Sequence, residues 1–243
     1  MRTIAILLVL AATVFAGPAS AYDADDPANC VGPDWDDARP LTVAKVTASP
    51  RVNFVKSPYD DDFKADSCPA ATAACRKRAY LVAGDLVLVG RTRGEFTCVS
   101  YEAPKKSNES DKRSVSTRGW LPGAALAPVA PAAAPARSDW LGSWNKPHAG
   151  IEIKPGGLGG RLQIDGIAVF PTAHDFHNGV IDAQVMPDRD SISFLDDGWM
   201  PFETKCDSGC RVRMRRIGDL LLVEDNGDCG GAGVTFTGLY RRK

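Results

Sequence analysis

The sequence has few of the features that draw a chain to nucleic acid or hold it in a membrane. The formal net charge is only −1 over 243 residues, and no long apolar run follows the first 21 residues. A near-neutral chain has no bulk attraction to nucleic acid, and a membrane-spanning helix needs about 20 apolar residues. We therefore expect no nucleic-acid partner and no transmembrane segment in the mature chain.

Sequence patterns of catalytic and metal sites are also missing. There is no G-x-S-x-G nucleophile motif and no C-x-x-C pair, and the close histidines His174 and His177 have no third ligand spaced nearby. The adjacent acids Asp196-Asp197 and Glu224-Asp225 would point to opposite faces of a strand, which is poor geometry for a cooperating acid and base. We expect a protein without catalysis, metal or cofactor.

The first 21 residues have the three parts of a secretory signal peptide. Arg2 is the positive start, residues 4–15 are the apolar part, and Ala19-Ser20-Ala21 is an A-x-A cleavage site. The apolar part is short for a membrane anchor, which is the alternative interpretation. We expect an exported protein, periplasmic or extracellular, whose mature chain begins with an acidic segment at 22–39.

The seven cysteines agree with that destination, because disulfides form and persist in oxidising compartments. Their spacing predicts one bridge between Cys68 and Cys75 and another between Cys210 and Cys229. A third bridge is expected between Cys30 and Cys98, which leaves Cys206 over. Hairpin register alone would place Cys206 opposite Cys229, so the sequence leaves two candidate partners for Cys229, Cys206 and Cys210.

Short runs with a period of two, separated by turn formers, indicate an all-β fold throughout. Val212 and Met214 alternate with their neighbours before Ile217-Gly218-Asp219, as Leu220 and Leu222 do after it, which predicts a β-hairpin. The Pro/Ala-rich residues 128–137 read as an extended linker. We expect a small barrel over 40–127 and a second, antiparallel up-and-down barrel over 138–243.

Three motifs in the first part occur in a characteristic order. Gly84-Asp85 precedes an apolar strand, F-x-C-V-x-Y follows at 96–101, and G-W-L-P-x-x-x-L spans 119–126. In this order they resemble a bacterial Src-homology-3-like domain, a family that commonly docks on peptidoglycan or its stem peptides. The resemblance makes the long loop at 57–79 the binding loop. It implies Tyr59, Phe63 and Trp120 as candidate binding residues.

The second part has the marks of another group. Gly142 and Trp144 lie on its first strand, and Tyr240 with Arg241 or Arg242 lies on its last. This pattern is similar to the calycin group, which holds lipocalins, avidins and small secreted protease inhibitors. The resemblance implies that the tryptophan plugs the closed end of a barrel and that the basic side chain, Arg241 in our assignment, packs across it.

The predicted strand at the C-terminal hairpin also carries a row of arginines. With Val212 and Met214 facing inward, Arg211, Arg213 and Arg215 would lie on the outer face at intervals of about 6.6–7 Å. Such a row is either a solubilising face, balanced by acids such as Glu224 across the hairpin, or a binding site for carboxylate or phosphate groups.

From export, the first resemblance and the missing catalytic set, we expect a secreted, non-catalytic binding protein of the cell envelope. The expected partner is peptidoglycan, another envelope component or an extracellular protein. Two alternatives remain. One is a secreted inhibitor of a protease or lysozyme, as some calycin-type barrels are. The other is a cell-wall hydrolase whose site the sequence does not reveal.

Overall fold

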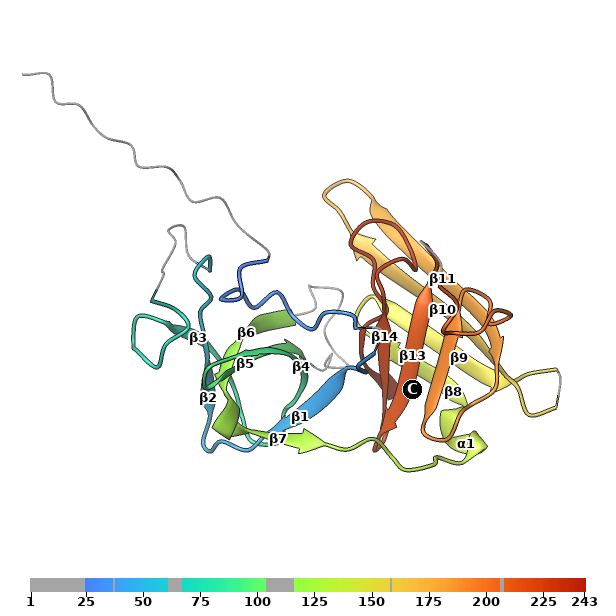
Figure 1. Ribbon diagram of the computed structural model, residues 1–243, viewed down its shortest axis with the longest axis horizontal. Coiled ribbons are helices and arrows are strands. Elements are labelled where there is room, and N and C mark those ends of the chain that lie inside the picture. Colours follow the sequence, from blue (N-terminus) through green and yellow to red (C-terminus); the bar gives the residue numbers. More distant parts are fainter. Residues whose placement is uncertain (1–24, 37, 61–66, 104–115, 158, 206–207) are drawn as a thin grey trace, which may run out of the picture.

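The structure is a computed structural model, and it describes residues 25–36, 38–60, 67–103, 116–157, 159–205 and 208–243 (Figure 1). The predicted signal peptide, Phe63 and Cys206 lie outside these residues. Among the described residues, no helix has the length and apolar character needed to cross a membrane. Apart from one short helix and a 3₁₀ turn, the regular secondary structure of these residues consists of two antiparallel sheets, which confirms the all-β prediction.

The first sheet contains seven strands in the order β3-β2-β6-β5-β4-β1-β7. The strands are β1 (Thr42–Val46), β2 (Val52–Val55), β3 (Arg76–Leu81), β4 (Leu86–Arg93), β5 (Phe96–Glu102), β6 (Ser116–Pro122) and β7 (Leu126–Val129). A 3₁₀ turn, η1 (Gly123–Ala125), joins β6 to β7. Because β7 pairs with β1 as far as Val129, the first two residues of the predicted linker continue this sheet.

The second sheet follows a short helix, α1 (Arg137–Trp140), and has eight strands. These are β8 (Gly142–Lys146), β9 (Ala149–Pro155), β10 (Leu162–Pro171), β11 (Phe176–Val185), β12 (Ser191–Leu195), β13 (Arg211–Ile217), β14 (Leu220–Asp225) and β15 (Gly238–Arg242). Neighbours in sequence pair with one another within β8–β11 and within β12–β15, and β15 pairs with β8. The result is a nearly closed up-and-down barrel, as predicted, with its seam between β11 and β12.

The interior of this barrel is filled by its own side chains. Trp140, Trp144, Phe194, Phe236 and Tyr240 are all fully buried in one apolar cluster with the inward residues of the strands. The Tyr240 hydroxyl donates a hydrogen bond to the Phe236 carbonyl at 2.8 Å, and the Trp144 indole donates to the Trp140 carbonyl at 2.9 Å. Burial raises the pKa of Tyr240 well above its usual value, so it stays a neutral donor.

The basic residue that packs on Trp144 differs from the one we assigned. The guanidinium of Arg242 lies 4.7 Å from the Trp144 ring centre and donates to the Asp139 carbonyl at 2.6 Å. Arg216 also packs on this ring, at 4.5 Å. The assignment to Arg241 was wrong because side chains alternate along β15, and Arg241 is one residue out of phase with Arg242.

A separate apolar cluster joins the two sheets. Leu41, Val43 and Leu88 from the first part pack against Ile217, Leu220 and Leu222 of the barrel. Every residue of β14 is consequently buried, since Leu221 and Val223 face the barrel interior while Leu220 and Leu222 face the first sheet. Figure 1 shows β13 and β14 on the side of the barrel next to the first sheet. A strand buried on both faces reads as a continuous apolar run, as Leu220 to Val223 does.

The three predicted disulfides are confirmed. Cys30 is bonded to Cys98, Cys68 to Cys75, and Cys210 to Cys229. The first bridge attaches the segment before β1 to β5, and the third holds the start of β13 to the loop that follows β14. Each bridge joins two cysteines of the same half of the chain, two bridges in the first half and one in the second, so no disulfide among the described residues links the two sheets.

Candidate functional site between the two sheets

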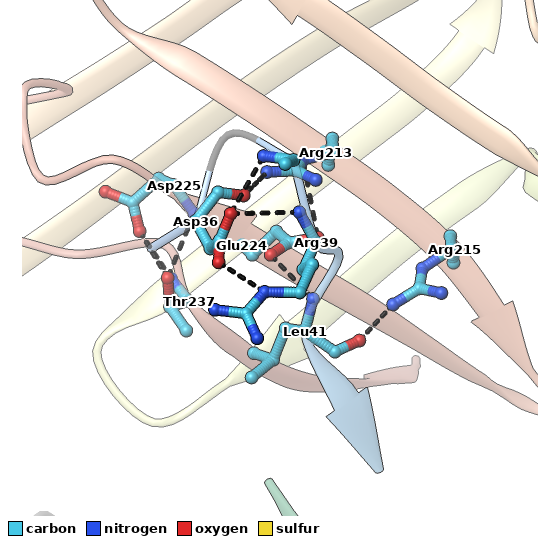
Figure 2. Close-up of polar contacts among 9 residues, drawn as sticks. Asp36, Arg39, Leu41, Arg213, Arg215, Glu224, Asp225 and Thr237 are labelled. Atoms are coloured by element: carbon cyan, nitrogen blue, oxygen red, sulfur yellow. Dashed lines mark hydrogen bonds and ion pairs between the residues drawn. The ribbon is translucent and has the colours of Figure 1, made fainter. Parts of the chain in front are cut away.

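The arginines of the β13 row donate hydrogen bonds to backbone carbonyls of the protein itself, and Figure 2 shows two of these arginines. Arg213 donates to the Asp36 carbonyl and Arg215 to the Leu41 carbonyl, so both hold the segment that leads into β1. Arg211 donates to the carbonyls of Phe202 and Thr204. The row does face away from the barrel interior, as predicted, but of the two alternatives for it the solubilising face is wrong for Arg213, which is only 7% exposed.

Arg213 is held by an acid and by an aromatic ring. It lies directly opposite Glu224 on β14, with 3.6 Å between Nε and Oε1, and its guanidinium lies 4.3 Å from the Trp35 ring centre. Glu224 Oε2 also accepts the Leu41 N–H at 2.9 Å. Burial raises the pKa of Glu224, while the Leu41 hydrogen bond and the arginine charges act against that rise.

The neighbouring carboxylate, Asp225, has a different, structural role. It points away from Glu224, as predicted for adjacent residues of a strand, and its Oδ1 accepts from the hydroxyls of Thr235 and Thr237 at 2.6 and 2.7 Å. The same oxygen accepts the N–H groups of Phe236 and Thr237 at 3.0 and 2.9 Å. Asp225 therefore fixes the chain that enters β15.

Beside this interface lies a pocket of about 410 Å³ to which both parts of the chain contribute. We call it the interdomain cleft. Its polar and charged lining is Asp85, Ser100, Tyr101, Glu102, Asn145, Lys146, His148 and Arg241. The first four residues come from the start of β4 and the end of β5, and the others from β8, the turn after it and β15. The cleft thus brings carboxylates and cations together from two sheets.

A charged pair with a buried lysine joins the two sheets at the cleft. Lys146 Nζ lies 3.8 Å from Glu102 Oε1, and the lysine side chain is only 5% exposed. Gly238 leaves room for this lysine, because a Cβ at that position would lie 2.6 Å from Lys146 Cδ. Glu102 Oε2 is buried and accepts no hydrogen bond from the described residues. A buried acceptor without a donor is costly, and the nearby Lys146 ammonium offsets part of that cost.

Tyr101 is the neutral hydrogen-bonding group of the cleft. Its hydroxyl lies 3.5 Å from Asp85 Oδ1, whose other oxygen accepts the Val82 N–H at 2.9 Å. Burial raises the pKa of Tyr101, and the Asp85 charge raises it further, against the opposing charge of Arg241. The Tyr101 hydroxyl therefore stays protonated near neutral pH and can donate a hydrogen bond.

The other sequence-predicted binding residues do not join this cleft. Trp120 is fully buried, and its indole N–H donates to the Ala28 carbonyl at 3.0 Å, so it serves the core of the first sheet and presents no surface. Tyr59 is half-buried, and Phe63 lies outside the described residues. Trp120 was misassigned because an aromatic residue of a strand looks the same in sequence whichever face it occupies.

Histidine and acid positions do not form a metal centre in the part of the chain that the structure describes, where no three His, Cys, Asp or Glu side chains are grouped as ligands. His177 Nδ1 lies 2.6 Å from the Ala232 carbonyl, and its ring stacks on Phe170 with 6.3 Å between centres. His148 instead lines the interdomain cleft.

Sequence reasoning missed the cleft because its residues carry no local motif. Asp85 was noted only as part of a turn before a strand, and Lys146 and Glu102 lie 44 positions apart in sequence. The sequence analysis assigned Arg241 to Trp144, whereas the structure places it in the cleft. The alternation of side chains along β15 is the one sequence signal that puts Arg241 and Arg242 on opposite faces.

In comparisons with known proteins, no family model, no curated protein and no solved structure matches this chain.

Proposed function

We propose that the protein is an exported, non-catalytic binding protein of the cell envelope, and that its ligand occupies the interdomain cleft. The ligand we infer is a short peptide segment with both carboxylate and ammonium groups, such as the peptide part of a cell-wall polymer. The observation that carries this proposal is the cleft itself, which both sheets build and which contains charges of both signs.

The chemistry of the lining favours such a ligand. Arg241, at the cleft surface, suits a carboxylate, since a guanidinium can donate two parallel hydrogen bonds to it. The Asp85 carboxylate suits an ammonium group. Small-molecule sites often lie where two domains meet, with a few polar groups that fix the orientation of the ligand.

Three further observations support the class of protein. The three disulfides are compatible with an oxidising compartment and hence with export. The order of motifs in 40–127 resembles a bacterial Src-homology-3-like domain, whose members commonly bind peptidoglycan. The acids Glu224 and Asp225 are committed to the backbone and to threonines, so they do not form a catalytic pair.

The proposal is tested by calorimetric titration of the purified protein with soluble peptidoglycan fragments that retain free amino and carboxyl groups. We expect binding that weakens about tenfold in Asp85→Asn and in Arg241→Gln, because each substitution removes one charge-assisted contact. The matched controls are Asp219→Asn, in the turn after β13, and Arg93→Gln, at the end of β4; both charges are exposed and lie outside the cleft lining, so these variants should bind as the parent does.

Mass spectrometry of the fragments after incubation supplies the second half of the test. Unchanged fragment masses support binding without catalysis. Hydrolysed fragments would contradict it and favour the cell-wall hydrolase. Equal affinity for the cleft variants and their controls would place the ligand elsewhere.

A further inference from the structure

The outer surface of β9, β10 and β11 exposes apolar side chains that no described segment covers. Ile167 and Val180 lie directly opposite each other on β10 and β11 and are 53% and 63% exposed. On the other side of Ile167 the partner residue is Gly150, which has no side chain to fill the space. The result is a shallow groove of about 430 Å³ lined also by the strands' acidic residues. We call this the β9–β11 face.

A row of three carboxylates runs beside the apolar row. Glu152 on β9 lies directly opposite Asp165 on β10, and Asp165 lies opposite Asp182 on β11. Like charges placed directly opposite one another on neighbouring strands destabilise a sheet. The Glu152 and Asp165 side chains are about half exposed, so they remain within reach of a partner.

Other side chains of the protein neutralise the negative charge of this row only in part. Lys154 Nζ lies 2.9 Å from Glu152 and 4.0 Å from Asp165, and that proximity to Glu152 raises its pKa. Gln163 donates hydrogen bonds to Asp165 at 2.9 Å and to Asp182 at 2.7 Å, but an amide contributes no charge. One ammonium for three carboxylates leaves the row negative.

The two rows have a fixed spacing. They are two residues apart along each strand, about 6.6–7 Å, and successive carboxylates are one strand apart, about 4.8 Å. A helix that lies across the strands presents residues of one stripe every turn, about 5.4 Å, which is close to the strand spacing. A partner with a basic stripe beside an apolar stripe would meet both rows at once.

We propose that the β9–β11 face is a docking surface for a protein segment, an amphipathic helix in its simplest form, with basic side chains next to apolar ones. Charge complementarity selects this partner, because basic side chains relieve the repulsion within the acidic row while apolar ones cover Ile167 and Val180. The face is separate from the interdomain cleft in all but Asn145, which lines both. The proposal therefore goes beyond the function proposed above.

The experiment measures the binding of a fluorescent helical peptide, with lysines along one stripe and leucines along the next, by anisotropy at several salt concentrations. Its control is a peptide of the same composition in scrambled order. We expect the amphipathic peptide to bind the parent more tightly than the scrambled one does. The double variant Glu152→Gln/Asp182→Asn should lose about tenfold in affinity, the sum of two exposed ion pairs.

Matched variants separate the face from the overall charge. Asp188→Asn/Glu203→Gln makes the same change of charge at exposed positions outside this face and should bind as the parent does. For the apolar row, Val180→Ser should weaken binding severalfold, whereas Val82→Ser, at an exposed valine just after β3, should not.

Four results would overturn the proposal. They are equal binding of the scrambled peptide, an equal loss in the control variants, self-association of the parent that the face variants abolish, and calcium binding by the acidic row in the absence of peptide. The first two indicate general electrostatic attraction. The third identifies a second copy as the occupant, and the fourth a metal ion.

Discussion

Two parts of the outer surface of the barrel resemble each other in sequence, but one is buried against the rest of the protein and the other is exposed. The outer face of β13 and β14 carries Arg213, Glu224 and Leu222, and it is covered by the first sheet and by the segment that leads into β1. The β9–β11 face carries carboxylates beside Ile167 and Val180, and these stay exposed. Both surfaces mix charged and apolar residues.

The difference lies in whether charges find partners within the chain. On the covered face each arginine of the row donates to a backbone carbonyl, and Glu224 has both an arginine and a backbone N–H. On the β9–β11 face a single lysine faces three carboxylates. Charges that are buried and paired serve the fold, whereas the incompletely neutralised row beside exposed apolar residues is the surface for which we propose a docking role.

The largest expected effect comes from the disulfides, one of which attaches the segment that covers the outer face of β13 and β14. Replacing Cys30 and Cys98 by serine should lower the free energy of unfolding by about 4 kcal/mol, because the bridge closes a loop of 68 residues. The same change at Cys210–Cys229, with a separation of 19, should cost about 3 kcal/mol, and at Cys68–Cys75, with 7, about 2 kcal/mol. Urea unfolding without reductant measures all three.

Loss of the Cys30–Cys98 bridge should also loosen the segment that leads into β1 and covers the outer face of β13. If Cys30–Cys98 anchors the segment before β1, its loss should increase amide exchange at Leu41, whose N–H is bonded to Glu224. Equal costs for the three double variants would show that loop length does not control their contributions. Unchanged exchange at Leu41 would show that the arginines hold the segment without the disulfide.

The next prediction compares the two faces directly. Leu222→Ala removes a buried side chain between the sheets and should cost about 2–5 kcal/mol, since it leaves a cavity. Val180→Ala, on the β9–β11 face, should change stability by no more than about 0.5 kcal/mol. Thermal and urea unfolding measure both. A similar cost for the two variants would contradict the assignment of one face as covered and the other as bare.

The smallest expected effect concerns pH. Because burial raises the pKa of Glu224 above 4.5, the folded protein holds this proton more tightly than the unfolded chain does. Ionising it therefore costs folding free energy, and this contribution to stability is lost as the pH rises from 4.5 through the folded pKa. Between the two pKa values the free energy of unfolding falls by about 1.4 kcal/mol per pH unit.

Glu224→Gln should remove that decline while keeping an oxygen for the Leu41 N–H. The measurement is the free energy of unfolding against pH for the variant, the parent and Glu203→Gln, an exposed control. The difference between Glu224→Gln and the parent should shift in favour of the variant as the pH rises. A difference that does not vary with pH would mean that Arg213 offsets the burial of the carboxylate in full.

Several parts of the molecule were predictable because their signals are local. Alternation around Ile217-Gly218-Asp219 predicted the β13–β14 hairpin, and cysteine spacing predicted the Cys68–Cys75 bridge, whereas Cys210 as the partner of Cys229 was settled by the structure. The outward phase of Arg211, Arg213 and Arg215 followed from the inward phase of Val212 and Met214. What covered that outward face did not follow, because Asp36 and Leu41 lie more than 170 positions away in sequence.

The sequence by itself determined the all-β class, the hairpins and the Cys68–Cys75 bridge, since each depends on residues within one turn, one strand pair or one short loop, whereas the partner of Cys229 was decided by the structure. Only the tertiary structure decided which outer face of the barrel is buried, which arginine packs on Trp144 and which charges meet in the interdomain cleft. The reason is physical. A strand's pattern of side chains fixes its two faces, but the free energy that distinguishes them comes from whatever packs against each, and that partner is distant in sequence.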